Sequence, residues 1–217
     1  EKPLGYNYEN ALKIKKLANK NKSEVFVSLN RRFYSSTRYV LEDIKKIEGQ
    51  RLIQVYDQEE PDLLNRPQKV KRNWMYANSI HVVDYLSLFG RGEILSVQPI
   101  VNWNPDISSF VIAKIEYSSG DLGIYSAIWN APGPWGVSVS TNEKRFELRP
   151  LEFASVQSKG SREIKSLPVH KWDKEFKPGL RFQAEEIQKK IEGASHNLVS
   201  LNESLKTMEL IKEIYEI

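Results

Sequence analysis

The sequence predicts an α+β fold: an open, mostly antiparallel sheet with helices on one face, preceded by the tail of a βαβ unit. Three observations predict it. Helix-period and strand-period segments alternate up to Gly90, strands then follow one another at short spacing, and helices close the chain. With 217 residues and 40% hydrophobic content, the chain can bury a core of this kind.

Up to Gly90 the predicted order is helix, strand, helix, strand, loop and helix, over residues 8–21, 24–29, 34–47, 51–56, 57–72 and 73–89. The first helix and strand resemble the end of a βαβ pattern whose beginning is missing. The loop holds Pro61 and Pro67, and its length predicts that it borders a pocket, because long structureless connections are uncommon in compact domains.

After Gly92 the alternation of apolar and polar residues predicts strands at residues 94–101, 110–118, 123–129, 135–141 and 144–149. Short turns between them favour a meander with one covered face. Residues 159–179 read as irregular, and helices are expected at 180–192 and 202–215, with Asn202 at the cap of the last one. The other sheet face stays open, which predicts a homo-oligomer formed through it.

Composition excludes several classes of function. The formal charge is only +4, and acidic residues are interspersed with basic ones, so a nucleic-acid partner is not expected. The chain has no cysteine and three scattered histidines, which offer no metal-ligand spacing. No apolar stretch approaches the ~20 residues of a membrane span, and no signal peptide precedes the first helix, so we expect a cytoplasmic protein without a membrane partner.

Four motifs occur in a specific order: Glu1-Lys2-Pro3-Leu4, Asn30-Arg31-Arg32-Phe33, residues 78–84 (Asn-Ser-Ile-His-Val-Val-Asp) and residues 202–211. Together they resemble the glucose-fructose oxidoreductase / inositol dehydrogenase (Gfo/Idh/MocA) family over essentially the whole chain. The resemblance implies that residues 1–30 are the C-terminal remnant of a Rossmann dinucleotide-binding domain. Residues 31–217 would be a substrate-binding and oligomerisation domain.

By the same resemblance, the chain is part of an NAD- or NADP-dependent oxidoreductase acting on a sugar or sugar nucleotide, in polysaccharide or lipopolysaccharide precursor synthesis. The Gly-x-Gly-x-x-Gly turn that holds a pyrophosphate is absent from the sequence. We therefore expect a fragment, inactive alone, whose cofactor is bound mainly by a missing N-terminal domain. The alternative is a non-catalytic, oxidoreductase-like module that binds sugars or serves assembly.

The resemblance assigns Lys2 and Pro3 to the nicotinamide end of the cofactor, and makes Lys2 and His81 the catalytic residues. A lysine in a desolvated pocket can stabilise a developing alkoxide, and a histidine can relay its proton. One departure weakens the enzymatic case: Ala77 stands one helical turn before His81, where family members commonly carry an aspartate. Asn78 is assigned to substrate binding, although regular helical spacing turns its side chain away from His81.

The remaining candidates for substrate binding are Asn30, Arg31, Arg32 and Trp135. An arginine pair can hold a phosphate or carboxylate bidentately, or it can clamp the junction of two domains. Trp135 belongs with Trp129, Arg145 and Arg149 to a cluster near a Pro-Gly-Pro turn, suited either to stacking on a sugar or to packing.

Overall fold

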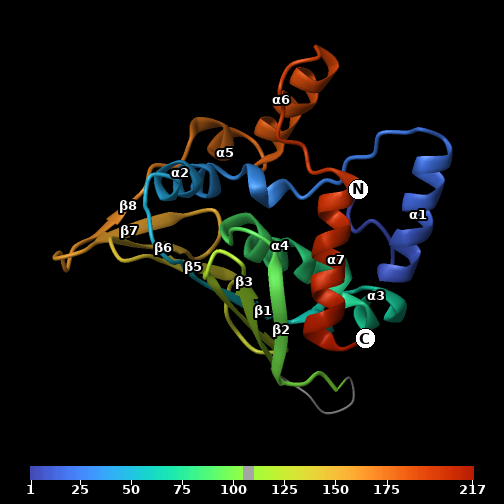
Figure 1. Cartoon of the computed structure of the whole chain (residues 1–217), viewed down its shortest axis with the longest axis horizontal. Helices are drawn as coiled ribbons and strands as arrows, with labels where there is room; N and C mark the ends of the chain where they lie inside the picture. The colour runs from blue at the N-terminus through green and yellow to red at the C-terminus, as the bar shows by residue number, and fades with distance from the viewer. Residues whose placement is uncertain (105–109) are drawn as a thin grey trace.

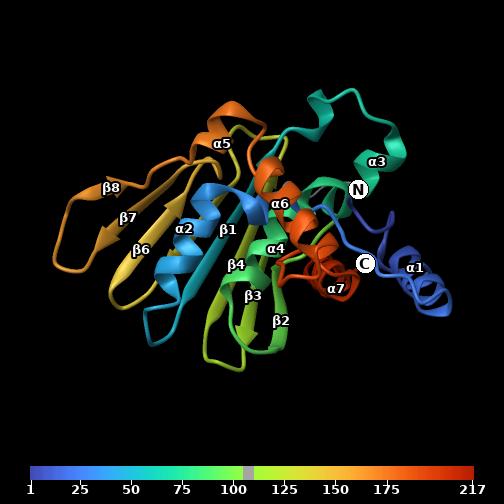
Figure 2. The ribbon, with the colours of Figure 1, turned by 90° about the horizontal axis from the view of Figure 1, so that it is seen from above.

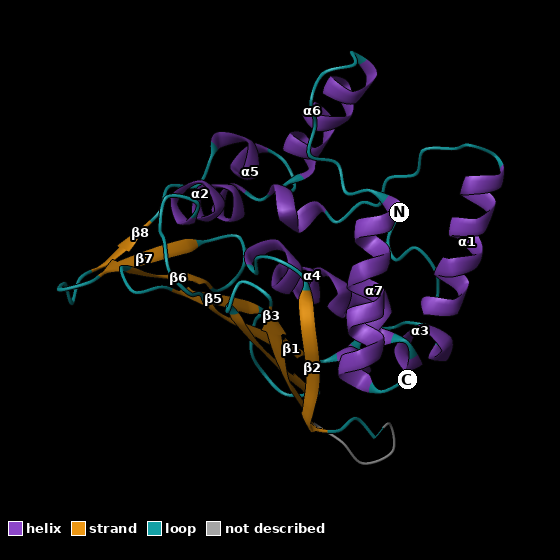
Figure 3. Cartoon of the chain, viewed as in Figure 1, coloured by secondary structure: helices purple, strands orange, loops and turns teal. Residues whose placement is uncertain are grey.

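The computed structural model describes residues 1–104 and 110–217. One eight-stranded sheet runs in the order β2-β3-β4-β1-β5-β6-β7-β8. Helices lie over one of its faces and leave the other uncovered (Figure 1). The colouring by secondary structure makes the two layers plain (Figure 3). The predicted α+β class, with an open sheet and helices on one face, is confirmed.

The strands are β1 Leu52–Glu59, β2 Ile94–Val101, β3 Phe110–Tyr117, β4 Leu122–Trp129, β5 Gly136–Ser140, β6 Lys144–Leu148, β7 Ala154–Ser158 and β8 Ile164–Ser166. The helices are α1 Tyr8–Lys20, α2 Ser35–Ile44, α3 Gln68–Arg72, α4 Ile80–Phe89, α5 Lys171–Glu175, α6 Leu180–Ile191 and α7 Leu201–Tyr215. Shorter 3₁₀ turns span Asn30–Phe33 and Pro61–Leu63, and a π-helical turn spans Met75–Ser79.

Strand β1 lies in the middle of the sheet, parallel to β4 and antiparallel to β5. The prediction of a simple meander from β4 to β5 was therefore wrong, because β1 separates them. All other neighbouring pairs are antiparallel. The central place suits β1 because Ile53, Val55 and Asp57 all point to the covered face and need helices above them.

The core lies between the sheet and helices α4 and α7. In α4 every residue from Ile80 to Leu86 is buried, as expected for a helix enclosed on all sides. Helix α7 buries Met208, Ile211 and Ile214 beside it. Helix α1 stands at the edge of the molecule next to α7, and α6 projects from the body (Figures 1 and 2).

The strand predicted at residues 24–29 does not form. Phe26 makes one isolated bridge with Ser200, flanked by hydrogen bonds from Val27 N to Val199 O (2.9 Å) and from Leu201 N to Val25 O (3.0 Å). In the part of the chain that the structure describes, this segment pairs with nothing else, and so short a ladder does not make a strand.

Other boundaries differ for local reasons. β1 continues three residues beyond the prediction, so Asp57, Gln58 and Glu59 are in the sheet and not in a loop. Part of the predicted loop is the short helix α3. The passage called irregular contains β8 and α5, and β7 precedes it. The strands β7 and β8 were not predicted because short strands in polar sequence carry little periodicity.

No helix in the described ranges is both long enough and apolar enough to cross a bilayer.

Candidate functional site

The N-terminal loop, the Asn30–Phe33 turn, the end of β1 and the start of α4 meet at one place, where Lys2 is held by the π-helical turn. Its ammonium donates to the Ala77 carbonyl and to the Asn78 side-chain oxygen, the latter at 3.0 Å. Such turns inside helices frequently occur at functional sites. The wider turn directs the Asn78 side chain to Lys2 and Glu59, and none of its hydrogen bonds in the described residues goes to His81.

Glu59, the last residue of β1, lies on the other side of Asn78. Its two carboxylate oxygens accept from Asn78 Nδ2 at 2.8 and 2.9 Å, and one of them accepts from Trp74 Nε1 at 2.7 Å. Burial raises the pKa of Glu59 to about 7, and the charge of Asp57 also raises it. The hydrogen bonds from Asn78 and Trp74 and the charge of Lys2 lower this pKa and offset part of the rise.

The Lys2 amine is shifted in the opposite direction. Burial lowers its pKa to about 8, and the positive charge of Arg31 lowers it further, while Glu59 partly compensates. The site therefore contains an acid and a base whose pKa values both lie near neutrality. Proton transfer is most efficient with groups of this kind.

His81 is almost completely buried and faces Arg31. Arg31 Nη1 lies 3.0 Å from His81 Nε2 and 2.8 Å from Asn30 Oδ1. Because a guanidinium only donates, His81 Nε2 accepts and the ring is neutral, with its proton on Nδ1. That nitrogen is buried and has no hydrogen-bond partner among the residues that the structure describes. Burial and the nearby charge of Arg31 hold the pKa of His81 well below its usual value.

Trp135 is held beside His81 and Arg31 by the buried carboxylate of Asp57. Its indole Nε1 donates to Asp57 Oδ1 at 2.8 Å, and Tyr125 donates to Asp57 Oδ2 at 2.6 Å. Burial raises the pKa of Asp57. The Trp135 ring lies 5.6 Å from the Arg31 guanidinium and 6.1 Å from the His81 ring. It therefore presents a held aromatic surface to the site.

Two pockets of about 360 Å³ adjoin these residues. The first is lined by Lys2 and Pro3 and has an apolar wall that includes Val70 and Ala77. Arg31, Glu59 and Trp135 line the second, which thus combines a cation, a carboxyl group and an aromatic ring. Sites that bind polyhydroxylated ligands commonly place hydrogen-bonding groups beside an aromatic ring.

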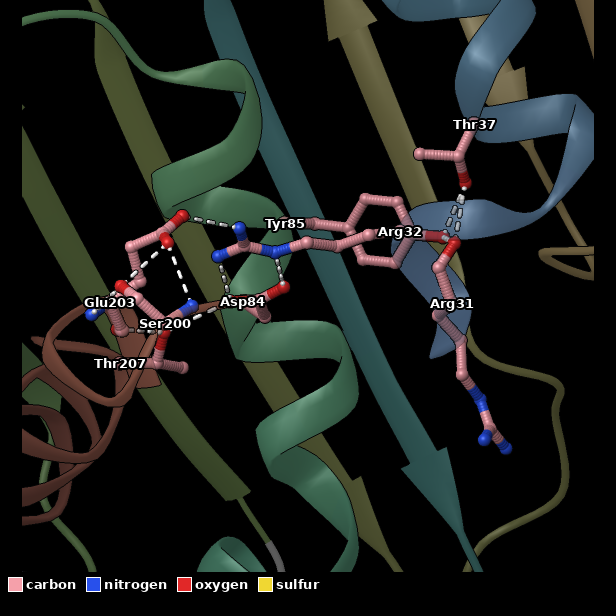
Figure 4. Close-up of polar contacts among 8 residues, drawn as sticks. All are labelled: Arg31, Arg32, Thr37, Asp84, Tyr85, Ser200, Glu203 and Thr207. Atoms are coloured by element: carbon pink, nitrogen blue, oxygen red, sulfur yellow. Dashed lines mark hydrogen bonds and ion pairs between the residues drawn. The ribbon is translucent and has the colours of Figure 1, made fainter. Parts of the chain in front are cut away.

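Arg32, the residue after Arg31, has a different environment. Figure 4 shows the Arg32 side chain directed to Asp84 on α4 and Glu203 on α7, and the Arg31 side chain leaving in another direction. Arg32 binds Asp84 through Nε (2.5 Å) and Nη2 (2.7 Å), and Glu203 through Nη1 (2.8 Å). The structure thus separates Arg32 from the other candidates. Its ion pairs join the Asn30–Phe33 turn to α4 and α7, which all lie within residues 30–217.

Asn30 is buried, with Nδ2 donating to the Pro178 carbonyl at 3.2 Å, and it orients Arg31. The predicted tryptophan and arginine cluster is split. Trp129 packs on Tyr215 in the core, Arg145 pairs with Glu147 on the open face, and Arg149 lies over the Tyr56 ring and contacts Gln58. Trp135 alone of that cluster joins the site.

A larger pocket of about 490 Å³ lies between α7 and β2, away from Lys2. Among its charged lining residues, Arg32 pairs with Glu203 and Lys206 pairs with Glu93. We do not assign the substrate to it.

Sequence reasoning missed Glu59 and Asp57 because it ended the strand at Tyr56. The signal was present: if the alternation of Ile53 and Val55 is continued, residues 57 and 59 fall on the covered face. A carboxylate there must be satisfied by hydrogen bonds or adopt its neutral form, and either marks a functional candidate.

The cofactor assignment can be tested against these residues. The pocket of Lys2 and Pro3 offers an apolar wall and one amine, which suits a nicotinamide ring. The Gly90-Arg91-Gly92 segment follows the end of α4, where Gly92 takes a positive φ of 77°. It does not precede a helix as a pyrophosphate-binding turn does. The residues present thus fit the nicotinamide end of the cofactor.

No family model matches this chain, and no curated protein matches it in sequence. Solved structures resemble it throughout. UDP-N-acetylglucosamine 3-dehydrogenase GnnA from Acidithiobacillus ferrooxidans superposes with a TM-score of 0.77 at 12% identity, covering 99% of this chain and 68% of that one. A dehydrogenase from Chromobacterium violaceum gives 0.76 at 18% identity, covering 98% and 67%.

The WlbA dehydrogenase from Bordetella pertussis, solved in complex with NADH and UDP-GlcNAcA, gives a TM-score of 0.66 at 14% identity, covering 99% of this chain and 66% of that one. This chain therefore spans about two thirds of these structures and has the fold of their C-terminal part. The likeness establishes the fold, which is the fold that the motif resemblance implied.

Proposed function

We propose that this chain is the substrate-binding part of an NAD- or NADP-dependent oxidoreductase that acts on a sugar or sugar nucleotide. The observation that carries the proposal is the position of Lys2, whose amine has a pKa of about 8 and lies between the pocket at Pro3 and the carboxyl group of Glu59. Two proteins that share the fold support it: one is named a UDP-N-acetylglucosamine 3-dehydrogenase, and the other holds NADH with UDP-GlcNAcA.

Oxidation of a ring hydroxyl removes a hydride from carbon and a proton from oxygen. The nicotinamide accepts the hydride when the cofactor is bound. The residues of this chain manage the proton and the sugar. Lys2 binds the reacting hydroxyl, and its amine takes the proton in oxidation or supplies it in reduction. Residues 1–30 then belong to the nucleotide-binding part of the enzyme, and residues 31–217 bind the substrate.

Arg31, Asn78 and Trp135 complete the proposed substrate site. Arg31 makes its side-chain hydrogen bonds to neutral groups, Asn30 and His81. No salt bridge to Arg31 occurs within residues 1–104 and 110–217. A partly buried guanidinium without a carboxylate partner is suited to an anionic group of the ligand, a carboxylate or a phosphate. Trp135 provides the face on which the sugar ring packs.

The second candidate is a non-catalytic sugar-binding or assembly module of the same fold. Two observations favour it: Ala77 removes the usual partner of the histidine, and His81 is held neutral against Arg31. Under this reading the pockets bind a sugar, but no hydride is transferred.

Turnover by the natural gene product that contains this chain distinguishes the two candidates. Reduction of NAD or NADP is followed by absorbance with a panel of UDP-sugars. We expect Lys2→Met to lower kcat by about 100-fold or more, since proton transfer by a positioned group contributes 10²–10⁴-fold. Lys20→Met, on the exposed end of α1, is the matched control and should leave kcat unchanged. A panel without turnover, or full turnover by Lys2→Met, would contradict the proposal.

A further inference from the structure

Lys2, Asn78 and Glu59 form a continuous hydrogen-bonded chain from the pocket to the end of β1. The Asn78 amide is its central link. Because both oxygens of Glu59 accept from Nδ2, the side-chain oxygen of Asn78 faces the Lys2 amine. The Trp74 indole, donating to the same carboxylate at 2.7 Å, keeps Glu59 in this position.

We propose that Glu59 is a positioning residue for Lys2: acting through the Asn78 amide, its carboxylate orients the Lys2 amine and sets the balance between its ammonium and free-amine forms. This inference rests on the proposed function, because a sugar oxidoreductase needs such an amine.

His81 is not suited to accept the substrate proton in place of Lys2. Its Nε2 faces the Arg31 guanidinium at 3.0 Å, and a protonated imidazole there would place two cations in contact. Within residues 1–104 and 110–217, its Nδ1 has no hydrogen-bond partner. Lys2 and Glu59, in contrast, both line pockets and both titrate near neutral pH.

The proton balance of oxidation follows directly. The cofactor, when bound, would accept the hydride released as the carbinol C–H bond breaks, and the hydroxyl proton passes to the free amine of Lys2. The resulting ammonium is stabilised by the Asn78 oxygen and, at longer range, by the ionised Glu59. In the reverse direction the ammonium returns the proton to the alkoxide.

Charged groups on each neighbouring element act on this pair. Asp57, two residues before Glu59 on β1, raises the pKa of Glu59, and Lys2 lowers it. Arg31 and Arg66 lower the pKa of Lys2, whereas Glu1 and Glu59 raise it. Glu59 is the one carboxylate among these that also contacts the Asn78 bridge.

The coupling is tested by NMR titration of the Lys2 side-chain Cε resonance in this chain, identified by its loss in Lys2→Arg. Glu59→Gln keeps the size of the side chain and removes the charge. We expect the Lys2 pKa to fall by roughly half a unit to one unit, the effect of removing a nearby opposite charge that is partly screened by water. An unchanged Lys2 pKa overturns the inference.

Glu152→Gln is the matched control, because Glu152 lines the same pocket as Glu59 but hydrogen-bonds Tyr34 and not Asn78. It should shift the Lys2 pKa much less than Glu59→Gln. An equal shift from both variants would show a general charge effect and would also overturn the inference.

The reciprocal experiment remains decisive if Glu59→Gln does not fold. Thermodynamic linkage requires that Lys2→Met raise the pKa of Glu59 by the amount that Glu59→Gln lowers that of Lys2. Neither titration depends on turnover. Coupling without sugar oxidation by the gene product would refute the proposed function alone, and oxidation without coupling would refute this inference alone.

Discussion

Two adjacent arginines in the Asn30–Phe33 turn, Arg31 and Arg32, have opposite surroundings. Arg32 is enclosed by the carboxylates of Asp84 and Glu203, and Thr207 donates to Asp84 at 2.9 Å. The backbone between them is also held, because the Arg31 carbonyl accepts from Thr37 and Tyr85 (Figure 4). The clamp thereby fixes the position from which the Arg31 side chain reaches the site.

Asp84→Asn should lower the free energy of unfolding by about 3 kcal/mol, because breaking a buried ion pair leaves the Arg32 charge without its main partner. Urea denaturation measures the change. Glu163→Gln removes one side of the exposed pair with Lys165 and is the control, expected within about 0.5 kcal/mol of the parent. Equal effects of the two substitutions would mean that the Arg32 pair is not a structural clamp.

The raised pKa of Glu59 predicts a pH dependence of stability. In the folded protein this carboxyl has a pKa of about 7, against an ordinary 4.5. Between these values the folded state binds more protons than the unfolded state. The contribution of Glu59 to the free energy of unfolding is therefore fully present below pH 4.5 and is lost as the pH rises through 7.

Glu59→Gln removes this titration. Relative to the parent, the variant should gain stability as the pH rises from 4.5 to 7. Urea denaturation of both proteins across that range provides the measurement. Parallel stability profiles would show that Glu59 titrates in the folded protein as it does in water.

At the scale of elements, α7 begins with a capping box. The Ser200 hydroxyl accepts from Glu203 N at 3.2 Å, and the Glu203 carboxylate accepts from Ser200 N at 2.9 Å. The sequence placed the cap at Asn202, two residues later. Glu203 also accepts from Arg32, so the start of the last helix is tied to the Asn30–Phe33 turn beside the site.

Ser200→Ala should destabilise the protein by about 1 kcal/mol, the usual cost of losing an N-cap side chain. Asn202→Ala, an exposed position in the same first turn, is the control and should have little effect. Thermal or urea unfolding of the two variants decides between the two cap positions, and a larger loss for Asn202→Ala would favour the sequence-based cap.

At the scale of the molecule, the sheet has one face under helices and one face without cover (Figure 3). The central part of the open face carries half-buried isoleucines, Ile112, Ile124 and Ile128, with the exposed Phe110 beside them. We propose that two copies of the chain pair through this apolar part, since uncovered apolar area of this kind marks association surfaces.

Sedimentation equilibrium tests the association. The parent chain should form dimers or larger oligomers, and Ile124→Lys should shift them to monomer by placing a charge at the centre of the open face. Lys165→Glu, near the far edge of the sheet on β8, is a charge-changing control that should leave the association unchanged. A parent chain that is only monomeric at high concentration would contradict the proposal.

The sequence by itself determined the fold class, most helices and strands, and the candidates Lys2, Arg31, His81 and Trp135, because periodicity and short motifs are local properties of the chain. Contacts between distant segments decided the rest. Three features depend on contacts between residues remote in sequence. They are the place of β1 between β4 and β5, the different partners of Arg31 and Arg32, and the hydrogen bonds from Lys2 through Asn78 to Glu59. The pKa shifts of Lys2 and Glu59 come first from burial, and these side chains are buried only once those segments have packed together.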